Sequence, residues 1–243
     1  MRFVYAGCIL ALSAVCNAGA ENLVYNDTSD PLFLLREDML LSESKIVFAH
    51  SDNNNALLRL GQAVSYGIND RFSVGINVHY QFDFDGSQDG FSSFDLGGVY
   101  RLDNCIANSS DIISDVLFGF KFGGSSHVRM PWFADSTYYA GLRFGKQWNG
   151  VTLSGTVKSS WIFDDKYGMS YIDFIPEVYF RLVHDFKFGI GATIRAATND
   201  YYNQEWIDSK FVAQFGRTQY IALLDYEFEN NEIQIGAKLN ILF

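Results

Sequence analysis

A strict alternation of two kinds of side chain is the feature that most limits how this chain can fold. Between Phe72 and Phe82 every second residue is apolar or aromatic, and the residues in between are small or polar. The apolar set is Phe72, Val74, Ile76, Val78, Tyr80 and Phe82, and the intervening set is Ser73, Gly75, Asn77, His79 and Gln81. Successive side chains of a β-strand point to opposite faces, so the pattern predicts a strand between an apolar and a polar environment. Its length suits the roughly 9–11 residues with which a tilted strand crosses a bilayer.

The same alternation recurs along most of the chain. It predicts strands at 44–50, 58–68, 72–82, 94–102, 112–122, 138–144, 151–161, 172–182, 186–196, 206–215, 220–228 and 233–243. Short connections such as 69–70 and 216–219 alternate with mostly longer polar loops, and 103–111 is a longer exception among the short ones. An even number of strands with this arrangement is typical of outer-membrane barrels, and lipid leaves no partner for an open sheet edge. We therefore expect an all-β fold, a transmembrane antiparallel up-and-down β-barrel of about 12 strands, over residues 42–243.

The composition supports an interleaved distribution of apolar and polar residues. The 243 residues are 48% hydrophobic and 16% aromatic, yet the mean hydropathy is about zero. A soluble β-sandwich with an aromatic core is the alternative reading of these numbers. Aromatic residues gather near the expected strand ends, as in interfacial girdles. Those expected at the outer ends are Tyr80, Phe82, Phe94, Trp161, Tyr171, Trp206 and Phe228. A formal net charge of -10 and the absence of a basic run argue against nucleic acid as a partner.

The first twenty residues have the organisation of a secretory signal peptide. Arg2 precedes an apolar stretch over 3–16, and Ala18-Gly19-Ala20 supplies a small-x-small cleavage site before Glu21. The apolar stretch is shorter than the roughly 20 residues of a spanning helix. Two of the three cysteines fall in this segment, so the mature protein is expected to keep only Cys105, unpaired.

The end of the chain carries a second targeting feature. Its apolar parity is Ile233, Ile235, Ala237, Leu239, Ile241 and Phe243. The pattern formed by Gln234, Gly236, Leu239 and Ile241, with the terminal aromatic Phe243, resembles the C-terminal assembly signal of Gram-negative outer-membrane β-barrel proteins. In this chain the aromatic residue falls two positions after the motif ends. The resemblance implies recognition by the barrel assembly machinery, and the whole mature chain is similar to small barrels of the outer-membrane transporter type.

Residues 21–41 stand outside the alternation. Leu32, Leu35 and Met39 have helical spacing, so the segment is expected on the periplasmic side as a short helix or plug, in the barrel mouth or at the membrane surface. An extension of the first strand is the alternative.

Nucleophilic catalysis needs a nucleophile and a base that converge. His50, Ser51 and Asp52 provide the residue types, but neighbouring residues of a strand point to opposite faces. A resemblance to the twelve-stranded outer-membrane phospholipase family would require a His-x-Ser pair, which this sequence lacks. We therefore expect no enzymatic activity, and an outer-membrane enzyme is the disfavoured third reading.

Asp83, Asp85 and Asp89 form the one acidic group with metal-like spacing. Carboxylates at i and i+2 beside a glycine can converge on Ca²⁺ or Mg²⁺, but the third ligand and the distal Glu of an EF-hand are missing. A divalent ion at this external loop is the only cofactor considered, and a solvated acidic loop is the alternative.

The polar parity of the strands supplies the lumen-lining candidates. These are Arg59, His79, Asp95, Arg101, Asp115, Lys121, Arg143, Lys158, Asp173, Glu177, Arg181, Lys187, Arg195 and Lys238. Arg101, Arg143, Arg181 and Lys187 fall toward the periplasmic ends, which predicts a basic inner constriction with anion preference. The leading interpretation is a passive outer-membrane channel for small solutes, surrounded by lipid and lipopolysaccharide. In the alternative, the charges pair across the lumen and the protein is a plugged structural or adhesive barrel that acts through its loops.

Overall fold

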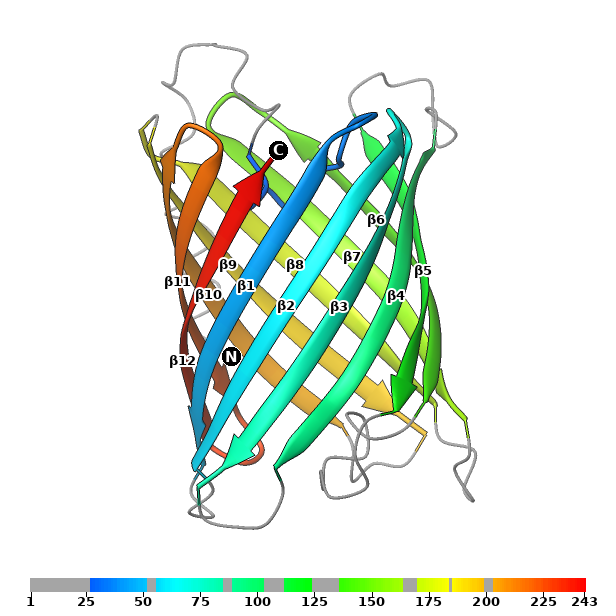
Figure 1. The fold of residues 1–243 in the computed structure, drawn as a ribbon, viewed down its shortest axis with the longest axis vertical. Coiled ribbons are helices and arrows are strands. Elements are labelled where there is room, and N and C mark those ends of the chain that lie inside the picture. The colour runs from blue at the N-terminus through cyan, green and yellow to red at the C-terminus, as the bar shows by residue number, and fades with distance from the viewer. Residues whose placement is uncertain are drawn as a thin grey trace.

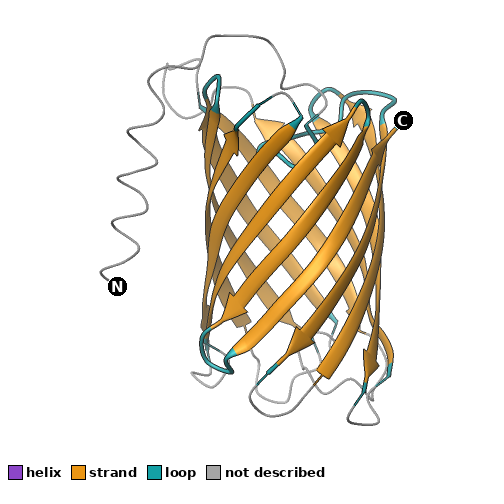
Figure 2. Ribbon diagram, turned by 90° about the vertical axis from the view of Figure 1, so that its left-hand side faces the viewer, coloured by secondary structure: helices purple, strands orange, loops and turns teal. Residues whose placement is uncertain are grey.

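The described part of the chain forms a closed antiparallel barrel of twelve strands (Figures 1 and 2). The computed structural model describes residues 27–51, 56–84, 89–102, 112–123, 136–163, 170–183, 185–198 and 203–243. The strands are β1 (Leu40–His50), β2 (Ala56–Asn69), β3 (Phe72–Asp83), β4 (Gly90–Leu102), β5 (Ile113–Gly123), β6 (Thr137–Gln147), β7 (Val151–Ile162), β8 (Ser170–Arg181), β9 (Phe186–Ala197), β10 (Gln204–Phe215), β11 (Thr218–Glu227) and β12 (Glu232–Leu242). The expected fold class is confirmed.

The barrel closes between its first and last strands. β1 pairs antiparallel with β12 from Leu41 opposite Leu242 to His50 opposite Ile233. The Phe243 N–H donates to the carbonyl of Leu40 at 2.8 Å, which extends the seam by one more bond. Because each strand also pairs with its neighbour in sequence, neither β1 nor β12 leaves a free edge.

The two ends of the barrel differ in their connections. At one end β1 begins and β12 finishes, and short connections such as 70–71 and 216–217 join the strands; we call this the turn end. It lies at the top of Figures 1 and 2. The opposite end, where β1 leads into β2 and β3 into β4, is called the loop end.

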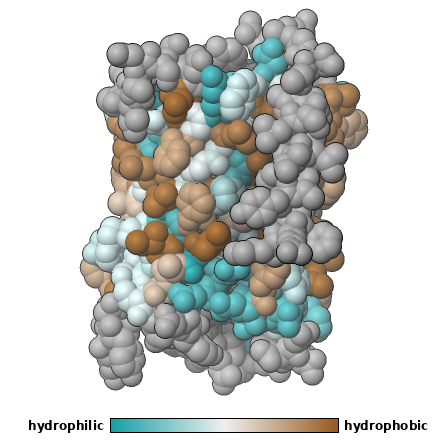
Figure 3. Space-filling model, turned by 180° about the vertical axis from the view of Figure 1, so that it is seen from behind, coloured by the Kyte–Doolittle hydropathy of each residue, from teal (hydrophilic) through white to brown (hydrophobic). Residues whose placement is uncertain are grey.

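The two faces of the wall follow the alternation of the sequence. Ile46, Phe118, Leu142 and Ile190 are exposed on the outer face, each between 42% and 49% accessible. Figure 3 shows apolar side chains across the middle of one side of the barrel and hydrophilic ones gathered toward the loop end. Residues opposite each other in register share a face. The polar parity therefore lines the lumen continuously around the barrel.

Two of the aromatics expected in the outer girdle face the lumen instead. Tyr171 lies opposite Ser160, and Trp206 lies opposite Glu227, both on the inward face. The guanidinium carbon of Arg195 is 4.0 Å from the Tyr171 ring centroid and 5.3 Å from that of Trp206. An arginine can retain its charge inside the barrel between such rings through cation–π contacts. The girdle assignment of these two residues was therefore wrong.

Residues 27–39, the described part of the segment before β1, contain no helix, so the spacing of Leu32, Leu35 and Met39 does not form one. Residues 27–39 form turns and coil, and Leu40 and Leu41 already belong to β1, two residues before the expected start of the barrel. The Asp30 carboxylate accepts a hydrogen bond from the Leu32 N–H at 2.8 Å, a local bond that competes with helix formation. Figure 1 shows this segment in dark blue at the turn end, behind β1 and β12. Among the described residues, no helix has the length and apolar character needed to cross a membrane.

Gly67 brings this segment against the wall of the barrel. Its N–H donates to the Met39 carbonyl at 2.9 Å, and its carbonyl accepts from the Asp38 N–H at 3.0 Å. A Cβ atom at position 67 would lie 1.8 Å from the Arg36 carbonyl oxygen. Only glycine allows this approach, and a register shift between Gly67 and Asn69 accompanies it.

Candidate functional site

All of the lumen-lining candidates occupy inward positions of the register. One band runs from Arg101 through Asp115 to Arg143, and another from Lys158 through Asp173 to Arg195. The others lie in matching bands, with Arg59 opposite Gln81, His79 opposite Gly61, Asp95 opposite Lys121, Glu177 opposite Gly191, Arg181 opposite Lys187 and Lys238 opposite Lys45.

The first charged cluster at the turn end is centred on Asp115, whose side chain is fully buried. Arg101 donates to its two carboxylate oxygens at 2.8 and 3.2 Å, and Arg143 donates to Oδ2 at 2.9 and 2.6 Å. The two guanidinium groups also reach the segment before β1. Arg101 donates to the Leu32 carbonyl at 2.6 Å, and Arg143 donates to the Phe33 carbonyl at 3.4 Å.

The second cluster receives the carboxylate of Asp27. Lys187 Nζ lies 3.0 Å from Asp27 Oδ2, and Arg181 Nε lies 3.6 Å from the same oxygen. The other oxygen accepts hydrogen bonds from the Tyr179 hydroxyl and the Gln219 amide, both at 2.9 Å. Asp27, Tyr179 and Gln219 have almost no exposed surface.

Asp30 fills a neighbouring position in the same cluster. Its carboxylate forms an ion pair with the Arg181 guanidinium and accepts a hydrogen bond from the Thr152 hydroxyl at 2.6 Å. The Gln147 amide donates to its other oxygen at 3.1 Å. A turn in which the Asp30 N–H donates to the Asp27 carbonyl at 3.0 Å brings both carboxylates to one guanidinium.

Charges closer to the middle and the loop end of the lumen are also paired. Asp173 binds Arg195 at 2.7 Å and Lys158 at 3.4 Å, and Arg59 binds Glu232 at 3.2 Å. Further ion pairs join Lys210 to Glu177 and Lys238 to Glu43, and His79 Nε2 lies 3.5 Å from the Asp95 carboxylate. The basic constriction expected near the periplasm is therefore neutralised, partly by Asp115 and partly by the segment before β1.

Residues 27–36, which we call the plug segment, separate two cavities of the lumen. A cavity of about 330 Å³ on one side is bordered by Asp30, Phe33, Arg143, Glu177 and Lys210, among others. A cavity of about 380 Å³ on the other side is bordered by Leu32, Arg36, Asp70, Arg101 and Gln147, together with Phe33 and Leu34. Ordered chain thus occupies the path along the axis at the turn end.

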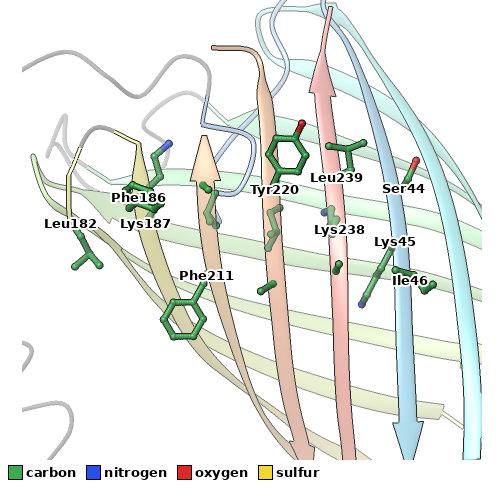
Figure 4. A pocket seen from close by; sticks show the side chains of 15 residues that line it. Ser44, Lys45, Ile46, Leu182, Phe186, Lys187, Phe211, Tyr220, Lys238 and Leu239 are labelled. Carbon is green, nitrogen blue, oxygen red and sulfur yellow. The ribbon is translucent and has the colours of Figure 1, made fainter. Parts of the chain in front are cut away.

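A third concavity, of about 760 Å³, lies in the wall across β9 to β12 and β1 (Figure 4). The small outward residues Ala213, Ala222 and Ala237 border it, together with the exposed rings of Phe211 and Tyr220. Ile46, Leu182 and Leu239 add apolar surface to its border, which also includes Ser44 and the lysines Lys45, Lys187 and Lys238.

Sequence reasoning missed several charged residues in the described part of the lumen, among them Asp27, Asp30, Glu43, Lys45, Asp208, Lys210 and Glu232. The inward parity of β10 includes Trp206 and Val212, which hid the polar pattern, and β1 was expected to begin only at Ser44. Applying the alternation to every residue of the expected strands would have found Lys45, Asp208 and Lys210, and extending the first strand toward its start would have found Glu43. No periodic signal marks Asp27 and Asp30, because they precede the first strand.

The described residues do not arrange Asp83 and Asp89 as ligands of a divalent ion. The Asp83 N–H donates to the Asp89 carboxylate at 2.6 Å, and Asp85 lies outside the described residues. Among the residues that are described, no group of three His, Cys, Asp or Glu side chains could hold a metal ion. Cys105 and the expected signal peptide also lie outside the described ranges.

No family model and no curated protein matches the chain. Solved structures do share its fold. The KdgM porin in complex with disordered oligogalacturonate aligns with a TM-score of 0.63 and 8% identity, over 83% of this chain and 98% of that chain. The NanC porin aligns with the same score and coverage at 11% identity. An outer membrane channel from Pseudomonas putida F1 aligns with a TM-score of 0.63 and 10% identity, over 93% of this chain and all of that one. The chain therefore has the fold of outer-membrane channel proteins.

Proposed function

We propose that this protein is an outer-membrane channel for small polar solutes, with the plug segment lying across its turn end. The observation that carries the proposal is a closed twelve-stranded wall that is apolar outside and charged inside. Such a wall suits lipid on one face and water with dissolved solutes on the other. The shared fold of structures named as porins and as an outer membrane channel supports it.

The targeting features agree with this location. A signal peptide at 1–20 would deliver the chain to the periplasm, and the pattern ending in Phe243 would present it to the barrel assembly machinery. The turn end would then face the periplasm, and lipopolysaccharide would surround the loop end. Deletion of Phe243 is expected to reduce insertion while secretion continues, as measured by fractionation.

A second candidate function is a structural or adhesive barrel that acts through its loops. The pairing of most lumen charges and the position of the plug segment favour it, because both reduce the space available to water. The two candidates differ in whether ions pass through the barrel.

Single-channel recording in planar bilayers distinguishes them. The purified protein is expected to show a small conductance, and a variant lacking residues 21–36, which keeps all of β1, a larger one. If neither protein conducts ions, although the shift in gel mobility on boiling shows that both are folded, the structural barrel would be favoured.

A further inference from the structure

The wall around Asp27 and Asp30 has the composition of a carboxylate-binding site. Arg181 and Lys187 supply two cations whose side chains are 8% and 6% exposed. Tyr179, Gln219, Thr152 and Gln147 supply neutral donors that all aim at the two carboxylates. Charged groups are buried at low cost only when they are paired and hydrogen-bonded, so this set of donors fits anions bearing carboxylates.

Three further basic side chains of the wall donate to the plug segment, whereas the Thr28 and Ser29 hydroxyls donate in the other direction, to the Gln219 amide oxygen. Arg101, Arg143 and Lys210 donate to the carbonyls of Leu32, Phe33 and Ser29. The wall therefore holds the segment largely through basic groups that bind acceptor oxygens. These are contacts that a free anionic solute could also make.

Removal of the segment would leave Arg181 and Lys187 next to each other in a narrow lumen. The two residues are opposite each other in register, and within the described part of the chain Asp27 and Asp30 are the acidic groups paired with them. Charges in a narrow low-dielectric wall attract counter-ions strongly. An anion from solution would take the place of the aspartates.

We infer that Arg181 and Lys187 form a carboxylate-binding site in the lumen, and that Asp27 and Asp30 occupy it as a tethered competitor. The ligand class is a small solute with two carboxylates a few atoms apart, because the Asp27–Asp30 turn presents two carboxylates to one guanidinium. Such a solute displaces the plug segment and opens its own path. This inference rests on the proposed channel function.

The first test uses succinate as the probe in planar bilayers at constant ionic strength, with neutral succinamide as the matched compound. Succinate should raise the conductance of the protein, and succinamide should not. The double variant Asp27→Asn/Asp30→Asn should have an open fraction about tenfold higher or more without succinate, because the loss of one side of buried ion pairs shifts an equilibrium by at least this factor.

The matched control is Glu37→Gln/Asp38→Asn, which removes the same charge from neighbouring exposed positions. It should behave as the unmodified protein does. Equal conductance of the two double variants, together with no response to succinate, would overturn the inference and leave the channel function standing.

A second measurement keeps all of these charges and does not depend on conduction. Ser29 is buried beside Gln219, and a Ser29→Cys variant in a Cys105→Ser background should react slowly with a maleimide. Succinate should accelerate the reaction several-fold, and succinamide should leave it unchanged. An unchanged rate with succinate would overturn the carboxylate site, even if the barrel conducts no ions and the channel proposal has failed.

Discussion

At the scale of single residues, three acidic side chains of the lumen each contact more than one basic group. Asp115 binds two arginines, Asp173 binds Arg195 and Lys158, and Asp27 lies within 3.6 Å of both Arg181 and Lys187. A carboxylate can accept hydrogen bonds from several donors, so one buried acid can pair with basic side chains from two strands of the wall. Replacement of one of these acids would therefore leave two basic side chains without their shared partner.

Asp115→Asn is expected to destabilise the barrel by up to about 3 kcal/mol, because two partly buried arginines would lose their shared, buried anion. The temperature at which the folded band disappears on unboiled gels measures this. Asp38→Asn is the control, since Asp38 is exposed and its φ of 60° suits asparagine. If the folded band of the two variants disappeared at the same temperature, Asp115 would not be needed to balance the charge of the two arginines.

Glu229, in the loop between β11 and β12, allows a prediction for pH. Partial burial first, and then the nearby Glu227 and Glu205, raise the pKa of its carboxyl above the ordinary value. A raised pKa means that the charged form is disfavoured in the folded state, so this destabilisation is present above the raised pKa and absent below the ordinary one. Glu229→Gln should therefore stabilise the protein slightly at pH 8. The difference from the unmodified protein should vanish as the pH falls through the raised pKa, and a difference that grew in acid would contradict this.

At the scale of elements, the strands follow their local pattern, whereas the plug segment depends on contacts with the whole wall. Leu32 and Leu35 are buried, yet they are buried in coil rather than on one face of a helix. Basic groups of β4, β6, β8 and β10 bind this segment. Its conformation is therefore determined by the assembled barrel.

Gly67→Ala is expected to release the plug segment from β2, because the added Cβ would overlap the Arg36 carbonyl. Trypsin should then cleave after Arg36 several-fold faster in the folded protein, as followed by gel electrophoresis. Gly155→Ala is the matched control, since its Cβ would meet only ordinary contacts at 3.4 Å from Phe144. Similar cleavage rates of both variants would show that the close approach at Gly67 does not hold the segment.

At the scale of the whole molecule, closure of the sheet produces two ends with different roles. The start of β1, the end of β12, the short turns and the plug segment share the turn end, so the closing element found among the described residues lies on one side of the membrane. Solutes from the loop end would first meet the lumen charges and then the plug segment.

The orientation can be tested in whole cells by cysteine labelling in a Cys105→Ser background. Lys166→Cys, in the connection between β7 and β8 at the loop end, should react with an impermeant maleimide from outside. Asn69→Cys at the turn end should react only after the outer membrane is opened. The opposite result would invert the barrel, and recovery in the soluble periplasmic fraction would exclude the membrane location.

The sequence by itself determined the strands, their number and the face that most of the charged side chains occupy. A period of two is a local property, and neighbouring strands share a face once each one is oriented. For this reason Arg101, Asp115 and Arg143 could all be placed in the lumen before their contacts were known.

Only the tertiary structure decided which charges meet and what fills the turn end. Asp27 lies 152 residues before Tyr179 and 192 before Gln219 in the chain, and no local pattern connects them. The pairing of Arg181 and Lys187 with Asp27 and Asp30 arises because closure of the barrel creates a confined, basic space that the preceding segment enters. Contacts of this kind depend on the closed shape, so they cannot be read from the alternation that builds it.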